Sequence, residues 1–273
     1  MPNKLLQGSV WNTSGDWVAA GEPVTDDNAL VTEVARDIVT GDQGGVDLAS
    51  LLVPRGYSGS FGSSGAPLQA ACSDLRYLAR GGFFFESDAG GAAQRTDKIL
   101  LDAADSAVRA EIGSNAADPG YVDRIICARI TALIKGNIAF DTTIKPLVEV
   151  LQEASVTIAA AIANPLDRLH NQGGLVKCES VVTYMKMFGG EHTQDTAKIV
   201  NGDVVAGTLF YNHQAVSGDA TVLRVWNGGI LVFDRNSRFK EVTTVELYPG
   251  AKMYPSKPDG VSLIITNFND YRR

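Results

Sequence analysis

One phrase recurs three times toward the C-terminal end of the chain: TYMKMFGG at 183–190, TVLRVWNG at 221–228 and TTVELYPG at 243–250. Each copy runs from threonine through alternating apolar and charged residues to an aromatic residue, and ends at glycine. A fixed phrase that recurs at a short period is typical of repeat proteins. Alternation followed by glycine predicts a short strand that closes in a tight turn. We therefore expect stacked strand–turn units, an arrangement that more often presents a surface than performs chemistry.

The spacing of the turn positions indicates the kind of repeat. Weaker copies of the phrase extend upstream, and the turn markers fall at 136, 153, 172, 190, 207, 228 and 250, in steps of 17 to 22 residues. One turn of a parallel β-helix needs about 20 residues, enough for two or three short strands and their corners. Ankyrin, TPR and HEAT repeats are longer and helical, and the leucine-rich LxxLxLxxN string does not occur. The sequence therefore predicts an all-β fold, a single-chain parallel β-helix with an irregular N-terminal cap or arm.

Alternation within each copy predicts which side chains face the core. The expected inward residues are Met185, Met187, Leu223, Val225, Val245 and Leu247. Lys186, Arg224 and Glu246 are expected to face water. The aromatic position should also face outward, as a ladder of Phe188, Trp226 and Tyr248. That ladder is either a structural stack or part of a surface that binds a partner.

The expected organisation is a cap or docking arm at 1–45, a parallel β-helix at 46–256 and a terminal strand or tail at 257–273. Segments 48–62, 75–87 and 96–113 alternate less regularly and predict wider coils. Segments 103–113 and 148–163 also fit amphipathic helices by their apolar spacing, and we assign them to coils. Both ends are expected to cap the solenoid, with docking on a partner or strand exchange with a neighbouring subunit as the alternative.

Composition limits the classes of partner. The formal net charge is −7 and the only basic run is the terminal Arg272–Arg273, which argues against a nucleic-acid-binding protein. The longest apolar tract, 156–163, is too short to span a bilayer, and the N-terminus lacks the apolar region of a secretory signal. We therefore expect no membrane partner and synthesis in a cytoplasm. Cys72, Cys127 and Cys178 are far apart and are expected to be buried thiols.

Residues with catalytic or metal-binding spacing were sought along the whole chain. The three histidines have no neighbours at metal-ligand spacing, and GSSGAP near residue 62 does not satisfy the GxSxG pattern. Asp167 with Glu149, or Glu246 with Asp234, could form the carboxylate pair of a glycosidase. Neither pair has an aromatic cleft or a long insertion beside it. We predict no catalytic residues, no metal, no cofactor and no enzymatic activity.

The opening VWNTSGDWVAAGEPVTDDNALVTE, at 10–33, resembles the start of tailed-phage virion structural proteins that are built as parallel β-helices. The matching residues are Trp11, Asp16, Trp17, Pro23 and Asp27. Segment 48–62 and later coils such as TVLRVWNGG also resemble that family. The similarity covers most of the chain, although Glu22 stands where the family has a small or apolar residue, and the coils of 136–172 keep the turn glycine poorly.

This resemblance implies a structural protein of the virion, located on the head surface. The expected function is capsid decoration, in which the protein acts as a cement that bridges major capsid subunits, as a homo-oligomer with a trimer as the first expectation. The expected partner contacts are Trp11, Trp17, Phe188, Trp226 and Tyr248. The alternatives are a head-fibre or tail protein, or a receptor-binding protein that binds, or less plausibly cleaves, a host glycan.

Overall fold

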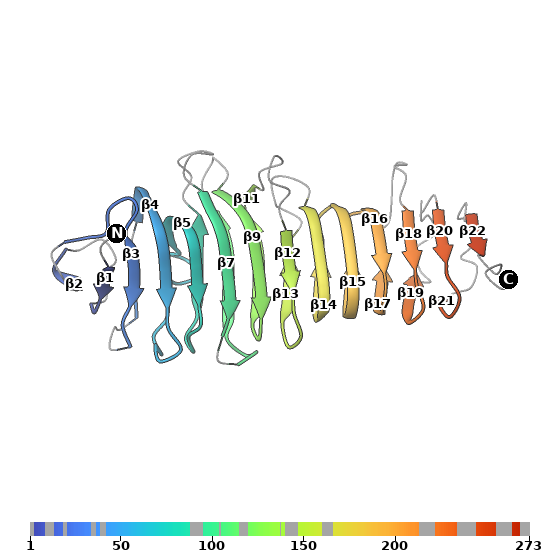
Figure 1. Cartoon of the computed structure of the whole chain (residues 1–273), viewed down its shortest axis with the longest axis horizontal. Helices are drawn as coiled ribbons and strands as arrows, with labels where there is room; N and C mark the ends of the chain where they lie inside the picture. The colour runs from blue at the N-terminus through green and yellow to red at the C-terminus, as the bar shows by residue number, and fades with distance from the viewer. Residues whose placement is uncertain are drawn as a thin grey trace.

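The computed structural model of the chain is an elongated stack of β-strands (Figure 1). It describes residues 3–8, 14–18, 21–33, 37–38, 42–87, 95–103, 105–114, 120–136, 138–139, 147–159, 166–212, 222–233, 244–254 and 264–267. Within these ranges, strand follows strand along the sequence from one end of the stack to the other. The chain is thus a single-chain parallel β-solenoid, which confirms the predicted fold class.

The elements lie in this order: β1 (Asn3–Leu6), the 3-10 helix η1 (Ser14–Asp16), β2 (Trp17–Val18), β3 (Asn28–Val31), β4 (Asp42–Val53), β5 (Leu68–Tyr77), β6 (Phe83–Ser87), β7 (Arg95–Asp102), β8 (Arg109–Ser114), β9 (Gly120–Ala128), β10 (Thr131–Gly136), β11 (Ile138–Ala139), β12 (Leu147–Val150), β13 (Ser155–Ile158), β14 (Leu166–Cys178), β15 (Val182–Gln194), β16 (Ile199–Val204), β17 (Gly207–Tyr211), β18 (Val222–Val225), β19 (Gly229–Phe233), β20 (Thr244–Leu247), β21 (Lys252–Tyr254) and β22 (Ile264–Asn267).

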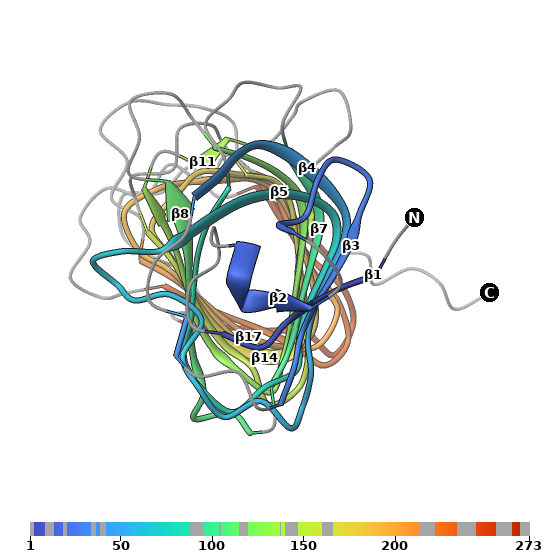
Figure 2. The same ribbon diagram turned by 90° about the vertical axis from the view of Figure 1, so that its left-hand side faces the viewer.

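The strands form two sheets, sheet 1 and sheet 2, and neighbouring strands within each sheet run parallel. Sheet 1 contains β1, β3, the second halves of β4 and β5, β7, β9, β12, the first halves of β14 and β15, β16, β18, β20 and β22. Sheet 2 contains the first halves of β4 and β5, β6, β8, β10, β13, the second halves of β14 and β15, β17, β19 and β21. Viewed along the stack, the strands form a ring, and β2 lies across its N-terminal opening (Figure 2).

Inward side chains stack in columns from coil to coil. One column of sheet 1 contains Leu51, Leu75, Ile99, Ile125, Val148, Leu169, Met185, Leu223 and Val245, all fully buried. The predicted inward residues Met187 and Val225 are also fully buried, and Leu247 packs partly buried against the core. Burial of such a side chain contributes about 1.5–3 kcal/mol, so the columns supply the main stabilisation that no single coil could provide. The predicted alternation is confirmed.

The corner from sheet 1 to sheet 2 requires a left-handed backbone. Arg129 and six later residues there have positive φ, and the six are Glu153, Gly173, Gly190, Gly207, Gly228 and Gly250. A Cβ on Gly190 would overlap the carbonyl oxygen of Gly174 in the preceding coil, so this corner also stacks backbone on backbone. We call these six positions the glycine corner.

The sequence markers place most of the glycine corner correctly. The marker at 172 lies one residue early, because β14 has a register shift against β15 at this point. The marker at Gly136 is wrong, since this glycine ends β10 on sheet 2. The equivalent turn of that coil follows β9, where Arg129 has a φ of 47°.

Parallel pairing extends beyond the segment 46–256 at both ends. β1 pairs with β3 and β3 with β4, while β20 pairs with β22. Segments 103–113 and 148–163, which also fitted helices, contain β8 and the strands β12 and β13. β2 runs antiparallel to β1 with Trp17 opposite Leu6, so the N-terminal segment folds back over the first coil.

Candidate binding surfaces

An aromatic pair lies on the outside of the solenoid beside the glycine corner. The rings of Trp226 and Tyr248 stack with centroids 3.8 Å apart and an interplanar angle of 7°. Each ring follows the last residue of its strand, and the backbone N–H groups of Trp226 and Tyr248 donate to the carbonyls of Val204 and Val225. Trp226 remains 37% exposed. The two residues therefore present a rigid, partly exposed aromatic surface.

Phe188 does not extend this stack. Met187 pairs with Val204 on β16, and Val204 pairs with Val225 on β18, so a whole coil separates Phe188 from Trp226. Phe188 is 46% exposed and lies beside its own neighbours. Its ring meets the His170 ring edge-on at 6.4 Å, and the Lys186 ammonium lies 5.0 Å from its centroid. Phe188 and Trp226 face outward as predicted, but only Trp226 and Tyr248 stack, because the intervening coil carries Val205 at that position.

Of the two N-terminal tryptophans expected to contact a partner, the structure describes only Trp17. Trp17 is only 5% exposed and belongs to the core cluster, so its ring packs at the N-terminal end of the solenoid. Trp11 lies outside the described residues.

A shallow concavity of about 480 Å³ lies on the outer face of sheet 1, over β14 and β15. It is lined by Asp167, Arg168, His170, Tyr184 and Lys186. The register brings Arg168 opposite Tyr184 and His170 opposite Lys186, so the four side chains form a compact block on adjacent strands. Burial lowers the pKa of His170, and the cations Lys186, Arg168 and Arg124 lower it further, against an opposite effect of Glu149. The concavity therefore holds two cations, Arg168 and Lys186, beside a partly buried imidazole.

Ion pairs continue along the outer face of sheet 1 beyond this concavity. Arg224 lies between two carboxylates, with Nη1 3.6 Å from Asp203 Oδ1 and Nε 3.1 Å from Glu246 Oε2. The Tyr184 hydroxyl donates to Asp203 Oδ2 at 2.6 Å, and this bond is the main reason that the pKa of Tyr184 is raised. Charges thus alternate in sign from coil to coil, which favours the observed register over a shifted one.

The carboxylates weighed as glycosidase pairs have other partners. Glu149 Oε1 lies 2.6 Å from Arg124 Nη2, and Asp167 Oδ2 lies 3.6 Å from Arg168 Nε. Glu246 belongs to the Arg224 pair, and Asp234 lies outside the described residues.

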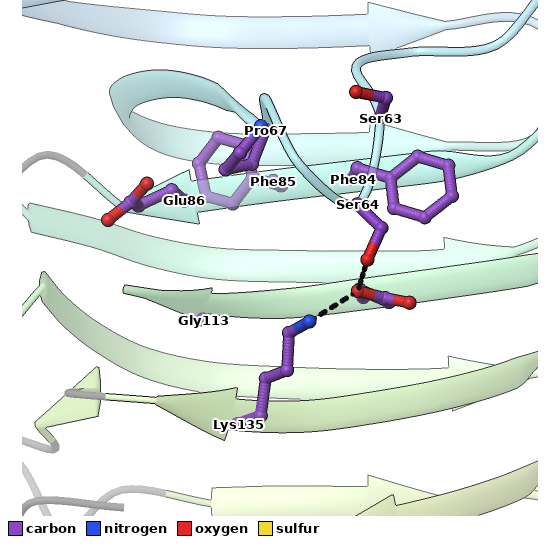
Figure 3. Close-up of a pocket in the computed structure, with 9 residues that line it drawn as sticks. Ser63, Ser64, Pro67, Phe84, Phe85, Glu86, Gly113 and Lys135 are labelled. Carbon is purple, nitrogen blue, oxygen red and sulfur yellow. Dashed lines mark hydrogen bonds and ion pairs between the residues drawn. The ribbon is translucent and has the colours of Figure 1, made fainter. Parts of the chain in front are cut away.

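A buried carboxylate on sheet 2 was missed by sequence reasoning. Glu111 is 4% exposed and accepts bonds from Ser64 Oγ at 2.8 Å, Lys135 Nζ at 2.6 Å and Arg109 Nη2 at 2.6 Å. Burial opposes its ionisation, but the bonds from Lys135 and Ser64 outweigh burial and hold its pKa below the usual value. Figure 3 shows Ser64 and Lys135 converging on this carboxylate.

The space beside Glu111 measures about 10 Å³, the size of about one water molecule. The network is therefore a latch that holds the 63–66 turn against sheet 2, rather than a ligand site. Ser64 belongs to the GSSGAP segment, which does not satisfy the GxSxG pattern, and the sequence carries no signal of the bond from Ser64 to Glu111.

Comparison with protein-family models, with curated proteins and with solved structures gives no match. Within the described ranges, no three His, Cys, Asp or Glu side chains gather closely enough to hold a metal ion. The same part of the chain contains no helix of the length and apolar character needed to cross a membrane.

Proposed function

We propose that the protein is a non-enzymatic structural component of a phage virion, which decorates the head and binds the major capsid protein. The observation that carries the proposal is the stacked pair of Trp226 and Tyr248. Large aromatic side chains, rigid and partly exposed, are typical centres of protein interfaces. The resemblance of the N-terminal segment and the coils to phage virion proteins supports a capsid surface as the partner of this pair.

The surroundings of the pair also suit a protein interface. Arg224 and Glu246 lie on the same two strands, and the Tyr248 hydroxyl donates to Glu246 Oε2 at 3.3 Å. The aromatic pair thus has a charged border, as an interface core has a polar rim. Burial of the two rings against a partner would contribute on the order of 2–4 kcal/mol.

A rigid solenoid is suited to reinforcing a shell. Its coils keep side chains at a fixed spacing of about 4.8 Å, so distant contacts can be held at once. We propose a homotrimer as the binding unit, because three weak contacts on one particle gain affinity through avidity. Sedimentation velocity of the purified protein measures the oligomeric state. A monomer at all concentrations would contradict the trimer, but it would leave the proposed docking surface unchanged.

The docking test uses phage heads that lack the protein. Wild-type protein should bind such heads stoichiometrically and raise the temperature at which they release DNA. Trp226→Ala and Tyr248→Ala should each weaken binding by about tenfold or more. Tyr254→Ala is the matched control, because Tyr254 is an exposed aromatic residue on β21 of sheet 2.

Equal binding by all variants would remove the aromatic pair from the interface. No binding by the wild-type protein would overturn the decoration function. Immunogold labelling of complete particles distinguishes the related alternative: a label on fibres or tails, rather than on the shell, would make the chain a head-fibre or tail protein.

A further inference from the structure

We propose that the concavity over β14 and β15 binds a carboxylate-bearing carbohydrate, such as a chain of uronic acid units. The site consists of Arg168, His170, Tyr184 and Lys186, with Phe188 at its edge. It lies apart from the Trp226–Tyr248 pair, since β16 separates the two surfaces. This function goes beyond decoration and does not depend on it.

The first argument is the availability of the cations. Among the described residues, no carboxylate lies within 4.0 Å of Lys186 Nζ, and the ammonium lies over the Phe188 ring. The Arg168 side chain is 42% exposed, and within the described part of the chain the carboxylate that approaches it is that of the adjacent Asp167, at 3.6 Å. Since the strands pair in register, the two cations project from neighbouring coils and can engage one ligand together.

The second argument is the presence of ring faces beside the cations. Phe188 is nearly half exposed, and the Tyr184 ring lines the concavity. The apolar C–H face of a pyranose packs on such rings, while its carboxylate reaches the cations. A free carboxylate or phosphate would use only the cations and would leave the exposed Phe188 without a role.

The third argument concerns hydrogen-bond acceptors at the border. Asp167 lines the concavity, while Glu149 lies opposite His170 and Asp203 opposite Lys186 on the adjacent strands. Sugar hydroxyl groups donate hydrogen bonds and can use these carboxylates. The side chains of an acidic peptide and the phosphates of a nucleic acid bring acceptors only, and cannot donate to these carboxylates as sugar hydroxyl groups do. The mixture of cations, rings and carboxylates therefore favours an acidic sugar.

The shape fits a polymer better than a small metabolite. The concavity is open and shallow and lies across two adjacent strands of sheet 1. Small-molecule pockets of a few hundred Å³ usually enclose most of their ligand. A linear oligosaccharide can instead lie along the stack and contact successive coils.

The test is isothermal titration of the full chain with oligogalacturonate, at low and at physiological salt. The matched ligand is methyl-esterified oligogalacturonate, which keeps the rings and removes the charge. We expect binding of the acid that weakens with salt, and at least tenfold weaker binding of the ester. Lys186→Gln and Arg168→Gln should each weaken binding by about tenfold, and Phe188→Ala by about fivefold. Lys252→Gln is the control, as an exposed lysine on sheet 2.

The result would overturn the proposal if the wild-type protein bound neither ligand, or bound the ester as tightly as the acid. Equal losses in Lys186→Gln and Lys252→Gln would indicate general charge attraction and would also overturn it. Polyglutamate is the third probe, and preference for it over the oligosaccharide would assign the surface to an acidic protein instead. Trp226→Ala should retain sugar binding, and Lys186→Gln should retain head binding, which keeps the two functions distinguishable.

Discussion

His192 donates a hydrogen bond from Nε2 to Oε1 of Gln194, at 3.0 Å, inside the core of the solenoid. Both side chains are fully buried on sheet 2. The Gln194 amide donates to the carbonyls of Ser180 and Ala197, at 2.8 and 2.9 Å, so its oxygen must face the imidazole. The proton therefore sits on Nε2 of His192, and Nδ1 is left without a hydrogen-bond partner.

This buried pair makes the protein sensitive to acid. Burial lowers the pKa of His192 to about 4, whereas in the unfolded chain the value is about 6.5. Above pH 6.5 both states are neutral and stability is highest. Between pH 6.5 and 4 only the unfolded state takes up the proton, so the free energy of unfolding should fall by about 3 kcal/mol over this range.

Urea denaturation across this range, with His192→Leu beside the wild type, measures the contribution. Leucine fits the column between Val176 and Leu209, and the variant should lose most of the pH dependence assigned to His192, whatever its absolute stability. Leu209→Val is the control that loses core volume but keeps the histidine. If the free energy of unfolding of His192→Leu depended on pH as steeply as that of the wild type, other groups would cause the acid sensitivity.

Two glycine-to-alanine variants separate backbone strain from overlap. Gly190 and Gly228 both have positive φ, of 72° and 99°. A Cβ at Gly228 would lie 3.7 Å from its nearest neighbour, so Gly228→Ala should cost only the left-handed strain, about 1–2 kcal/mol. Gly190→Ala should cost clearly more, because the Cβ also overlaps a backbone carbonyl. Chemical denaturation of both variants provides the comparison, and equal losses would contradict the close approach of the coils.

Glu153 offers the reverse experiment. It occupies the glycine corner with a φ of 65°. Glu153→Gly should stabilise the folded state by about 1–2 kcal/mol, because the left-handed strain is removed. The greater backbone freedom of glycine should stabilise the unfolded state by about 0.5–1 kcal/mol, so the free energy of unfolding should rise by up to about 1 kcal/mol. Thermal unfolding measures the change. Glu153→Ala keeps the strain and controls for loss of the carboxylate; stabilisation by alanine alone would assign the effect to charge.

The latch at Glu111 should be much more costly to break than a surface pair. Glu111→Ala removes the acceptor of the bonds from Ser64 and Lys135, and we expect a loss of about 1.5–3 kcal/mol together with faster proteolysis of the 63–66 turn. Glu246→Ala is the matched control, since its pair with Arg224 is partly exposed and should contribute at most about 1 kcal/mol. Similar losses in both variants would contradict a latch.

The three cysteines should be unreactive in the folded protein. Cys72, Cys127 and Cys178 are free and buried, as predicted, and burial raises the pKa of each thiol to about 12. Thiolate is the reactive form, so a thiol reagent at pH 8 should label none of the three within minutes. All three should react in denaturant. Rapid labelling of any native cysteine would reveal local opening of its coil.

The sequence could predict the solenoid because both of its requirements are local. Alternation placed Met185, Leu223 and Val245 inside, and a strand has a period of two whatever its neighbours are. Glycine marked most of the corner because a left-handed turn strains any residue that carries a Cβ. The break between Phe188 and Trp226 was also readable, because Val205 lies two residues before Gly207, where the three copies of the recurring phrase have an aromatic residue.

What remained out of reach depends on contacts between coils. The sequence could not show whether Gly136 or Arg129 occupies the corner between the two sheets, because the answer depends on which sheet the preceding strand belongs to. The offset at 172 accompanies the register shift between β14 and β15, where the buried Asn171 accepts at Oδ1 from the N–H groups of Gly173 and Gly174.

The sequence by itself determined the repeat, the inward columns and the reduced, buried state of the thiols, because each follows from side-chain period and apolar content along one segment. Only the tertiary structure decided the surfaces. It paired Trp226 with Tyr248, joined Arg168 and Lys186 in one concavity and closed Ser64 onto Glu111. These residues lie from 18 to 47 positions apart, and the register between coils alone brings them into contact.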